Sequence, residues 1–240
     1  MKKIYLYEDE IGSVEYVQHV GSDLTIVNSA RVSFGKEKSE LDDKDKKLIK
    51  YLISHKHTST LEHNLVTFRC KVPLFVRSQH HRHRTWSYNE ISRRYTSVDM
   101  QFYEPSSFRT QHESNRQASK QDMVNPDLND FSNMPLPVPP YLASEAVRSH
   151  NQKSLNLYNK LIEKGVCREQ ARGILPQSLY TEYYATCNLN NLIKFISLRT
   201  HEGAQWEIRQ LALGMLDIAK DLWPITIESF ESVSDVKLSS

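Results

Sequence analysis

The sequence predicts an α+β fold in which helices pack on a mixed or antiparallel sheet. Segments in which polar and apolar residues alternate, a pattern typical of strands, occur in both halves of the chain. Apolar residues three and four positions apart, a pattern typical of helices, separate these segments irregularly rather than in strict alternation. A chain of 240 residues can bury one core, so we predict a single domain over residues 1–240.

The N-terminal segment predicts two strands followed by two helices. Strand-like alternation covers residues 4–7 and 14–20. Asp23 is a suitable N-cap for a short helix that ends near residue 30. After a charged stretch, apolar residues at helical spacing within 48–53 predict a second, amphipathic helix.

The middle of the chain predicts two more strands and one helix. Apolar residues at every second position make 65–72 a clear strand. Pro73 suits the first turn of a helix that continues toward residue 82. Residues 95–103 resemble another strand. The polar, proline-rich stretch 106–140 is interpreted as a long loop excursion rather than a linker between domains.

The C-terminal part predicts four helices and one strand. A helix is expected over residues 140–165, and a shorter one around Ala171. Residues 179–187 are rich in aromatic side chains and strand-like. Asn190 is a candidate N-cap for the next helix. The last helix is the clearest, because residues 204–222 keep one face apolar.

Composition excludes several broad classes. A formal net charge of +2 is too small to predict a nucleic-acid or membrane partner. No apolar run approaches the roughly 20 residues that span a bilayer, and the N-terminus lacks the apolar centre of a signal peptide. Cys70, Cys167 and Cys187 show no paired spacing, so we expect a reducing, cytoplasmic setting.

Histidines and arginines gather in one part of the sequence. Six of the ten histidines lie between residues 55 and 83, and five arginines lie between residues 77 and 94. Charge alone would make this a solvated basic surface. However, aromatic, amide, hydroxyl and carboxyl side chains interrupt the basic ones between Trp86 and Ser92. Guanidinium groups bind phosphate bidentately and the other groups can bind a heterocycle, so the segment predicts a nucleotide pocket.

Two other classes of function stay open on the residues alone. The histidines could ligate a metal in a hydrolase, but His-Glu-x-x-His spacing is absent and adjacent histidines point apart on a helix. We therefore predict no metal site. The basic stretch could serve a nucleic-acid-binding module, although the near-neutral net charge argues against it. Neither a phosphate-binding glycine loop nor a Rossmann glycine pattern occurs, and the cysteines are expected to be inert thiols.

One motif resembles a known family. Arg82-His83-Arg84, followed by seven residues and then Ser92, is similar to the signature of the flavin-dependent thymidylate synthases, the ThyX family. Further segments resemble family segments in the expected order along nearly the whole chain: 57–63, 108–111 with 115–117, 169–176, and 198–199 with 204–209.

The resemblance implies a reaction and its partners. The family methylates dUMP to dTMP with 5,10-methylenetetrahydrofolate as carbon donor and NADPH as reductant, through a bound FAD. It also implies the fold of that family and a homotetramer whose active sites lie between subunits. No nucleic acid and no membrane are expected as partners.

The resemblance also implies roles for individual residues. Those expected to contact FAD are His57, Ser59, Glu62, Arg82, His83, Arg84, Asn89, Glu90, Asn188, Asn190 and Lys194. Those expected to bind dUMP are Gln79, Arg82, Glu90, Ser92, Arg93, Arg94, Arg172 and Arg199. A guanidinium beside the pyrimidine would stabilise the negative charge that develops there, so Arg199 is the expected catalytic residue. Ser92 has no base beside it in sequence, so we expect it to form hydrogen bonds rather than act as a nucleophile.

The sequence departs from the family pattern at two positions. The family often has Arg where this chain has Asn190, and His where it has Gly203. We expect Lys194 to replace the first positive charge near the flavin phosphates, and His201 to replace the second contact.

Overall fold

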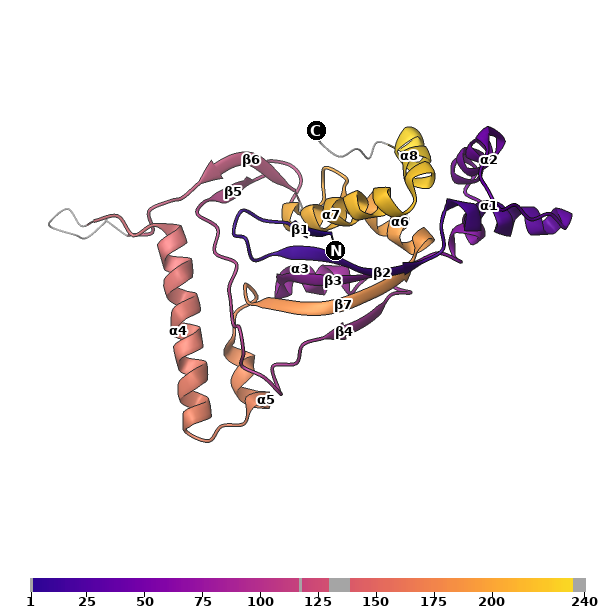
Figure 1. Cartoon of the computed structure of the whole chain (residues 1–240). Helices are drawn as coiled ribbons and strands as arrows, with labels where there is room; N and C mark the ends of the chain where they lie inside the picture. Colours follow the sequence, from indigo (N-terminus) through magenta and orange to yellow (C-terminus); the bar gives the residue numbers. More distant parts are fainter. Residues whose placement is uncertain (1, 117, 130–138, 235–240) are drawn as a thin grey trace. The chain divides into compact units, whose positions relative to one another are not determined.

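The computed structural model, drawn in Figure 1, describes residues 2–116, 118–129 and 139–234. The chain divides into two compact units. Unit 1 comprises Met1–Lys71, Ser78–Glu90 and Glu182–Ser240, and unit 2 comprises Val72–Arg77 and Ile91–Thr181. The single catalytic domain expected over residues 1–240 stays a prediction.

Unit 1 is built on a five-stranded sheet. In spatial order its strands are β1 (Lys3–Tyr5), β2 (Ser13–Val20), β3 (Leu65–Pro73), β7 (Tyr180–Asn188) and β4 (Ser87–Glu90) (Figure 1). β1 pairs with β2, β2 with β3, and β4 with β7, each antiparallel. The last two residues of β3 and the first two of β7 belong to unit 2. The predicted α+β class with an antiparallel sheet is confirmed. β4 escaped the sequence prediction because a four-residue strand is too short to show a period.

In the described residues, five α-helices lie wholly within unit 1 and supply most of its core. They are α1 (Asp23–Arg31), α2 (Asp43–Ser54), α6 (Leu189–Arg199), α7 (Trp206–Leu222) and α8 (Pro224–Val233). The apolar face predicted for α7 is buried, and it packs on β1 and β2. The approach is so close that a Cβ atom at Gly214 would lie 2.7 Å from Val14 Cγ1. Glycine is therefore required there, in spite of its poor helix propensity.

The beginning of α1 corrects one predicted cap. Ser22, not Asp23, is the N-cap, and its backbone N–H donates to Thr25 Oγ1 at 3.1 Å. The buried Asp23 carboxylate instead accepts hydrogen bonds at the first turn of α8: from the backbone N–H groups of Ile225 and Thr226, at 3.0 and 3.1 Å, and from the Thr226 hydroxyl, at 2.5 Å. Burial raises the pKa of Asp23 above its ordinary value, and these hydrogen bonds offset only part of that rise. Asp23 thus connects the first turn of α1 to Ile225 and Thr226 in the first turn of α8, 202 and 203 positions away in sequence.

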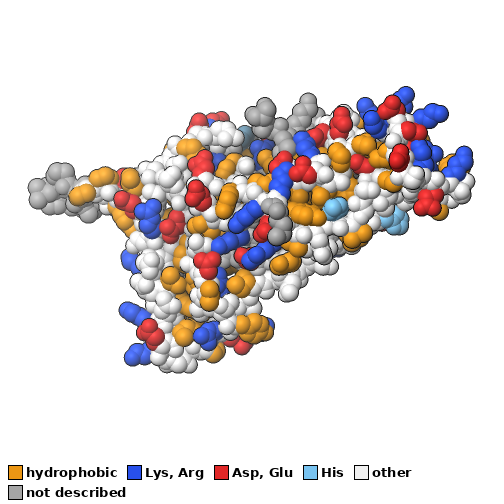
Figure 2. Space-filling model, in the orientation of Figure 1, with side chains coloured by type: hydrophobic (Ala, Val, Ile, Leu, Met, Phe, Trp, Pro, Cys, Tyr) orange, Lys and Arg blue, Asp and Glu red, His pale blue; other side chains and the backbone are white. Residues whose placement is uncertain are grey.

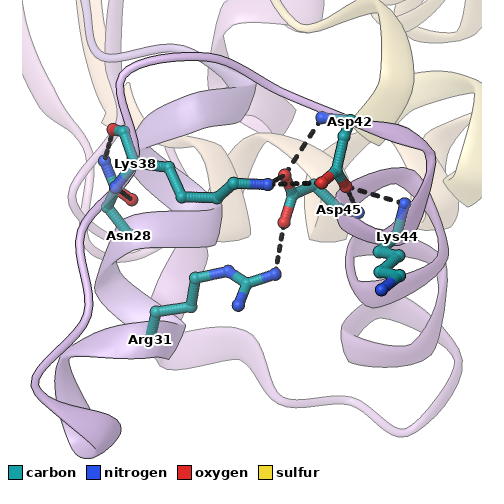
Figure 3. A network of polar contacts seen from close by, with 6 residues as sticks. All are labelled: Asn28, Arg31, Lys38, Asp42, Lys44 and Asp45. Atoms are coloured by element: carbon teal, nitrogen blue, oxygen red, sulfur yellow. Dashed lines mark hydrogen bonds and ion pairs between the residues drawn. The ribbon is translucent and has the colours of Figure 1, made fainter.

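A second buried carboxylate joins α1 to α2 (Figure 3). Asp45 has no exposed side-chain surface and forms ion pairs of 2.5 Å with both Arg31 and Lys38. Burial alone would raise the pKa of Asp45, but these two cations and the Asp42 backbone N–H hold it well below its usual range. Asp42 caps α2 through the backbone N–H groups of Lys44 and Asp45. On the outer surface of α1 and α2, basic and acidic side chains are intermingled (Figure 2).

Unit 2 is organised around α4 (Ala143–Glu163), which confirms the long helix predicted there. Its most buried residues, Asn151, Ser154 and Tyr158, include two polar ones, whereas the apolar Leu157 is 48% exposed. Asn151 donates to Glu104 Oε1 at 3.0 Å and accepts from the Ser178 hydroxyl at 2.8 Å. α5 (Arg168–Ala171) and the 3-10 turn Arg172–Ile174 follow, as predicted around Ala171.

Two segments of unit 2 differ from the sequence prediction. The strand predicted at 95–103 is wrong. That segment makes only an isolated bridge between Phe102 and Leu179, and a φ of +52° at Asp99 interrupts the extended conformation. Within the loop excursion predicted at 106–140, β5 (Phe108–Gln111) and β6 (Ser119–Val124) form an antiparallel pair. Residues 130–138 of that excursion lie outside the described residues.

α3 (Leu74–His80) follows β3 directly, as Pro73 predicts, and it ends just before the Arg-His-Arg motif. No helix in the described ranges is long and apolar enough to cross a membrane.

Candidate active site

The Arg82-His83-Arg84 motif lies on a turn that an aromatic cluster of unit 1 supports. At the centre of the cluster is His80, which is fully buried and hydrogen-bonded through Nδ1 to Tyr183 Oη at 2.8 Å. The rings of Trp86 and Phe195 lie 4.7 Å from it. Burial lowers the pKa of His80 well below its usual value, so it is a neutral core residue.

Tyr88 closes the turn from the other side. Its hydroxyl donates to the backbone carbonyls of His80 and His83, at 3.0 and 3.4 Å. Thr85 has a φ of +64°, which is uncommon for a residue with a side chain and marks a tightly constrained backbone. The side chains of Arg82 and Arg84 remain exposed. The turn therefore presents two guanidinium groups to solvent from a rigid base.

His83 and Arg199 meet within unit 1 although they are 116 positions apart. Arg199 Nε donates to His83 Nε2 at 3.0 Å, and the His83 ring packs edge-on against Phe195 at 4.8 Å. Burial and the nearby guanidinium lower the pKa of His83 to about 4. The histidine is thus neutral at pH 7, and because Nε2 accepts, its proton must be on Nδ1.

The guanidinium of Arg199 is half-buried, and burial lowers its pKa. In the part of the chain that the structure describes, its hydrogen bond to His83 uses Nε, and no bond occupies the two terminal nitrogens. These nitrogens form a pair of parallel donors held in a fixed direction. Such a pair suits the carbonyl of a heterocycle or a developing anion.

A second predicted pair also forms in unit 1. Asn190 is buried and donates from Nδ2 to Glu62 Oε1 at 2.8 Å. The sequence prediction that Asn190 caps α6 is wrong, because Asn188 is the N-cap and accepts from the Asn191 N–H at 2.9 Å. Asn190 lies in the first turn of the helix, where its side chain is directed to Glu62 instead.

Other residues expected to bind the cofactor are distributed over the surface of unit 1. His57 packs near Tyr51, with ring centroids 5.9 Å apart, and the Ser59 carbonyl accepts from the Glu62 N–H at 3.1 Å. Asn89 and Glu90 lie on β4, opposite Tyr184 and Tyr183 of β7. The side chains of Asn89 and Lys194 are exposed.

Four of the residues expected to bind dUMP lie in unit 2: Ser92, Arg93, Arg94 and Arg172. Ser92 and Arg94 share a turn in which Ser92 Oγ accepts from the Arg94 N–H at 3.3 Å, and the Arg94 guanidinium is exposed. Arg93 donates to the backbone carbonyls of Val98 and Asp99, at 2.6 and 3.3 Å. Arg172 is exposed on the turn after α5.

Comparison with known proteins shows which family this chain belongs to. Residues 15–225 match the family profile described as "Thymidylate synthase complementing protein". A protein of Thermus thermophilus named "Flavin-dependent thymidylate synthase" is 41% identical over 220 residues, which cover 92% of this chain and 76% of the relative. The chain belongs to the flavin-dependent thymidylate synthase family.

Further comparisons agree with this membership. A flavin-dependent thymidylate synthase of Thermosipho africanus is 39% identical over 219 residues, covering 91% of this chain and 90% of that one. The crystal structure of a UMP/dUMP methylase, PolB from Streptomyces cacaoi bound with 5-Br dUMP, matches with a TM-score of 0.76 and 32% identity. That match covers 94% of this chain and 97% of the methylase. The family and the enzyme class predicted from the sequence are confirmed.

The residues of unit 1 fit a flavin cofactor, which the family name implies. Exposed cations at Arg82, Arg84 and Lys194 suit the negative charge of a flavin phosphate, and the Glu62–Asn190 pair offers both a donor and an acceptor. Among the described residues, no group of three or more His, Cys, Asp or Glu side chains is arranged to hold a metal ion.

Sequence reasoning missed two residues beside the site, Gln205 and Glu207. Gln79 is hydrogen-bonded to Gln205, which donates in turn to Glu207 Oε2 at 2.9 Å. A signal for Glu207 was present, because it stands four residues before Leu211 and eight before Met215, on the apolar face of α7. A carboxylate at a core position indicates a specific polar partner.

Proposed function

We propose that this chain methylates dUMP to dTMP, with carbon from 5,10-methylenetetrahydrofolate and reducing equivalents from NADPH through bound FAD. The observation that carries the proposal is the 3.0 Å hydrogen bond from Arg199 to His83, which joins the expected catalytic arginine to the Arg-His-Arg motif. A methylase 32% identical to this chain is bound with 5-Br dUMP, which supports the nucleotide substrate.

Arg199 would activate the pyrimidine ring. Forming a bond at a uracil carbon requires negative charge to develop on the ring. Because Nε is anchored on His83, the two terminal nitrogens of Arg199 would already be oriented when the nucleotide binds. Preorganised donors of this kind stabilise an anion without the cost of reorganising solvent. Neutral His83 accepts the anchoring bond and adds no positive charge of its own beside the guanidinium.

The flavin would be held by residues of the Arg-His-Arg turn and of the first turn of α6. Arg82, Arg84 and Lys194 would neutralise its phosphates, and Lys194 would carry the charge that Asn190 lacks. Polar contacts from His57, Ser59, Glu62, Asn89, Glu90, Asn188 and Asn190 would complete the site, together with His83. FAD, when bound, supplies the redox chemistry that links NADPH to the transferred carbon.

The dUMP phosphate would be bound by arginines of unit 2. A dianion calls for several guanidinium groups, and Arg94 and Arg172 are exposed. The contacts of Arg93 with backbone carbonyls support a role in shaping the turn that carries Ser92 and Arg94, through which it would act on the nucleotide. The other residues expected to bind dUMP, which are Gln79, Arg82, Glu90 and Arg199, belong to unit 1.

We further propose a cytoplasmic homotetramer in which neighbouring subunits contribute to each active site. Size measurement by light scattering would test the assembly, since a monomer that still forms dTMP would exclude shared sites.

The visible spectrum of the purified protein tests the cofactor. Flavin absorbance near its usual visible maximum that bleaches with NADPH, followed by dTMP formation on adding dUMP and methylenetetrahydrofolate, is the expected result. A colourless protein that cannot be reconstituted with FAD would overturn the proposal.

A further inference from the structure

A chain of hydrogen bonds runs from Glu207, in the core of unit 1, through Gln205 to Gln79, which stands three positions before Arg82 of the Arg-His-Arg motif. Glu207 is only 4% exposed, lies in the first turn of α7, and its backbone carbonyl accepts from the Tyr7 hydroxyl at 3.2 Å. Gln205, the N-cap of that helix, donates from Nε2 to Glu207 Oε2 at 2.9 Å. Gln79, on α3, donates from Nε2 to Gln205 Oε1.

The carboxylate at the buried end sets the direction of every bond in this chain. A carboxylate only accepts hydrogen bonds, so Gln205 must turn its NH2 group toward Glu207. Its carbonyl oxygen then faces Gln79, and Gln79 can meet that oxygen only with its own NH2 group. The amide of Gln79 therefore cannot flip freely, and its Oε1 is the atom held away from Gln205. Without the carboxylate, the two amides could reverse together at little cost.

We infer that Glu207 is a positioning residue that makes Gln79 present an acceptor oxygen to the nucleotide. This inference rests on the proposed function, in which Gln79 binds dUMP. An acceptor selects a donor on the ligand, and uncharged donors on dUMP are the uracil N3–H and the ribose 3′-hydroxyl. Both offer the same chemistry to Gln79, so analogues that lack one or the other identify which is used. A phosphate oxygen is excluded as the partner of Oε1, because both atoms are acceptors.

The test compares nucleotide affinities of the FAD-loaded protein. Glu207→Met removes the carboxylate but keeps an unbranched side chain suited to a helix. Gln79 then loses its imposed direction and must be ordered by the ligand, so we expect the Kd of dUMP to rise about fivefold, the typical effect of immobilising one long side chain on binding. Adding Gln205→Glu to this variant supplies a carboxylate that accepts directly from Gln79. It should restore the Kd to within about twofold of wild type.

Two analogues separate orientation from general damage. dCMP lacks the N3–H, and 2′,3′-dideoxy-UMP lacks the 3′-hydroxyl. The Glu207→Met penalty should disappear for the one analogue that lacks the donor bound by Gln79, and persist for the other. If Glu207→Met does not accumulate as folded protein, Gln205→Met removes the oxygen that accepts from Gln79, at a half-exposed position, and gives the same comparison.

The outcomes distinguish the inference from the function beneath it. A Glu207→Met protein that binds dUMP with the wild-type Kd would overturn the inference that Glu207 positions Gln79. So would equal penalties for dUMP and both analogues, since that pattern indicates structural damage. Wild-type protein that binds FAD but no dUMP would instead overturn the proposed function, and the inference with it.

Discussion

Replacing Arg199 with lysine keeps a positive charge at that position but removes the planar guanidinium. In the structure, Nε donates to His83 Nε2 at 3.0 Å, and the two terminal nitrogens have no partner among the described residues. A lysine side chain ends in a single ammonium group, which can bind His83 or the pyrimidine but cannot form both contacts in the same geometry.

The magnitude follows from the number of preorganised donors that are lost. Losing one donor to a developing anion typically costs about 2.7–4 kcal/mol of transition-state stabilisation, or roughly 100–1,000-fold in kcat. We expect Arg199→Lys to lower kcat for dTMP formation by that factor, and Arg199→Ala to abolish turnover. The KM for dUMP should change less than about threefold, because an interaction made mainly in the transition state affects kcat.

The assay is steady-state dTMP formation, with the flavin content of each variant measured from its visible spectrum. Arg168→Lys is the matched control, because Arg168 is an exposed arginine of α5 outside the expected site. It should leave kcat unchanged. Arg199→Lys protein with a kcat within about threefold of wild type would refute the role of the guanidinium, and loss of FAD from that variant would indicate a cofactor contact instead.

Two further predictions concern stability and titration. Asp23→Ala leaves the Thr226 donors and the first turn of α8 without their acceptor, so it should lower the free energy of unfolding by about 2–3 kcal/mol and the melting temperature by about 4–10 °C. The control is Asp43→Ala, because the Asp43 side chain is 90% exposed; its free energy of unfolding in urea should stay within about 0.5 kcal/mol of wild type. Equal losses of stability in the two variants would contradict the stabilising role of Asp23 at the first turn of α8. His83 should titrate by NMR with a pKa of about 4 rather than 6.5. Because the unfolded chain binds this proton more readily, the contribution of His83 to stability falls as pH drops from about 6.5 through about 4. A midpoint near 6.5 would show that His83 is neither buried nor beside Arg199 in solution.

Much of the fold could be predicted from periodicity. β3 and α7 were clear because their buried faces recur every second residue and every three or four residues. The prediction failed where local pattern and long-range pairing disagree. Residues 95–103 look strand-like, yet only Phe102 makes a bridge, because a strand needs a neighbour along its length and Asp99 turns the backbone. α8 escaped prediction because its first turn is stabilised by Asp23, far away in sequence.

The candidate site divides in the same way. The Arg-His-Arg motif and its partner segments identified the family, because residue type and order along the chain are sufficient for that. Asp23 and Asn190 were expected to be N-caps, but a cap depends on which side chain meets which backbone group, and the structure has Ser22 and Asn188 in those positions. Sequence reasoning assigned no role to Gln205 or Glu207, because Gln79, to which Gln205 is hydrogen-bonded, lies 126 positions away in sequence.

The sequence by itself therefore determined the fold class, the family and the set of polar residues available for chemistry. Only the tertiary structure decided which of these residues meet. The structure shows that Arg199 donates a hydrogen bond to His83 and that Asn190 donates one to Glu62. It also shows that the buried carboxylate of Glu207, through Gln205, orients the amide of Gln79. The physical reason is that hydrogen-bond direction and pKa depend on burial and on partners brought together by packing, neither of which has a period along the chain.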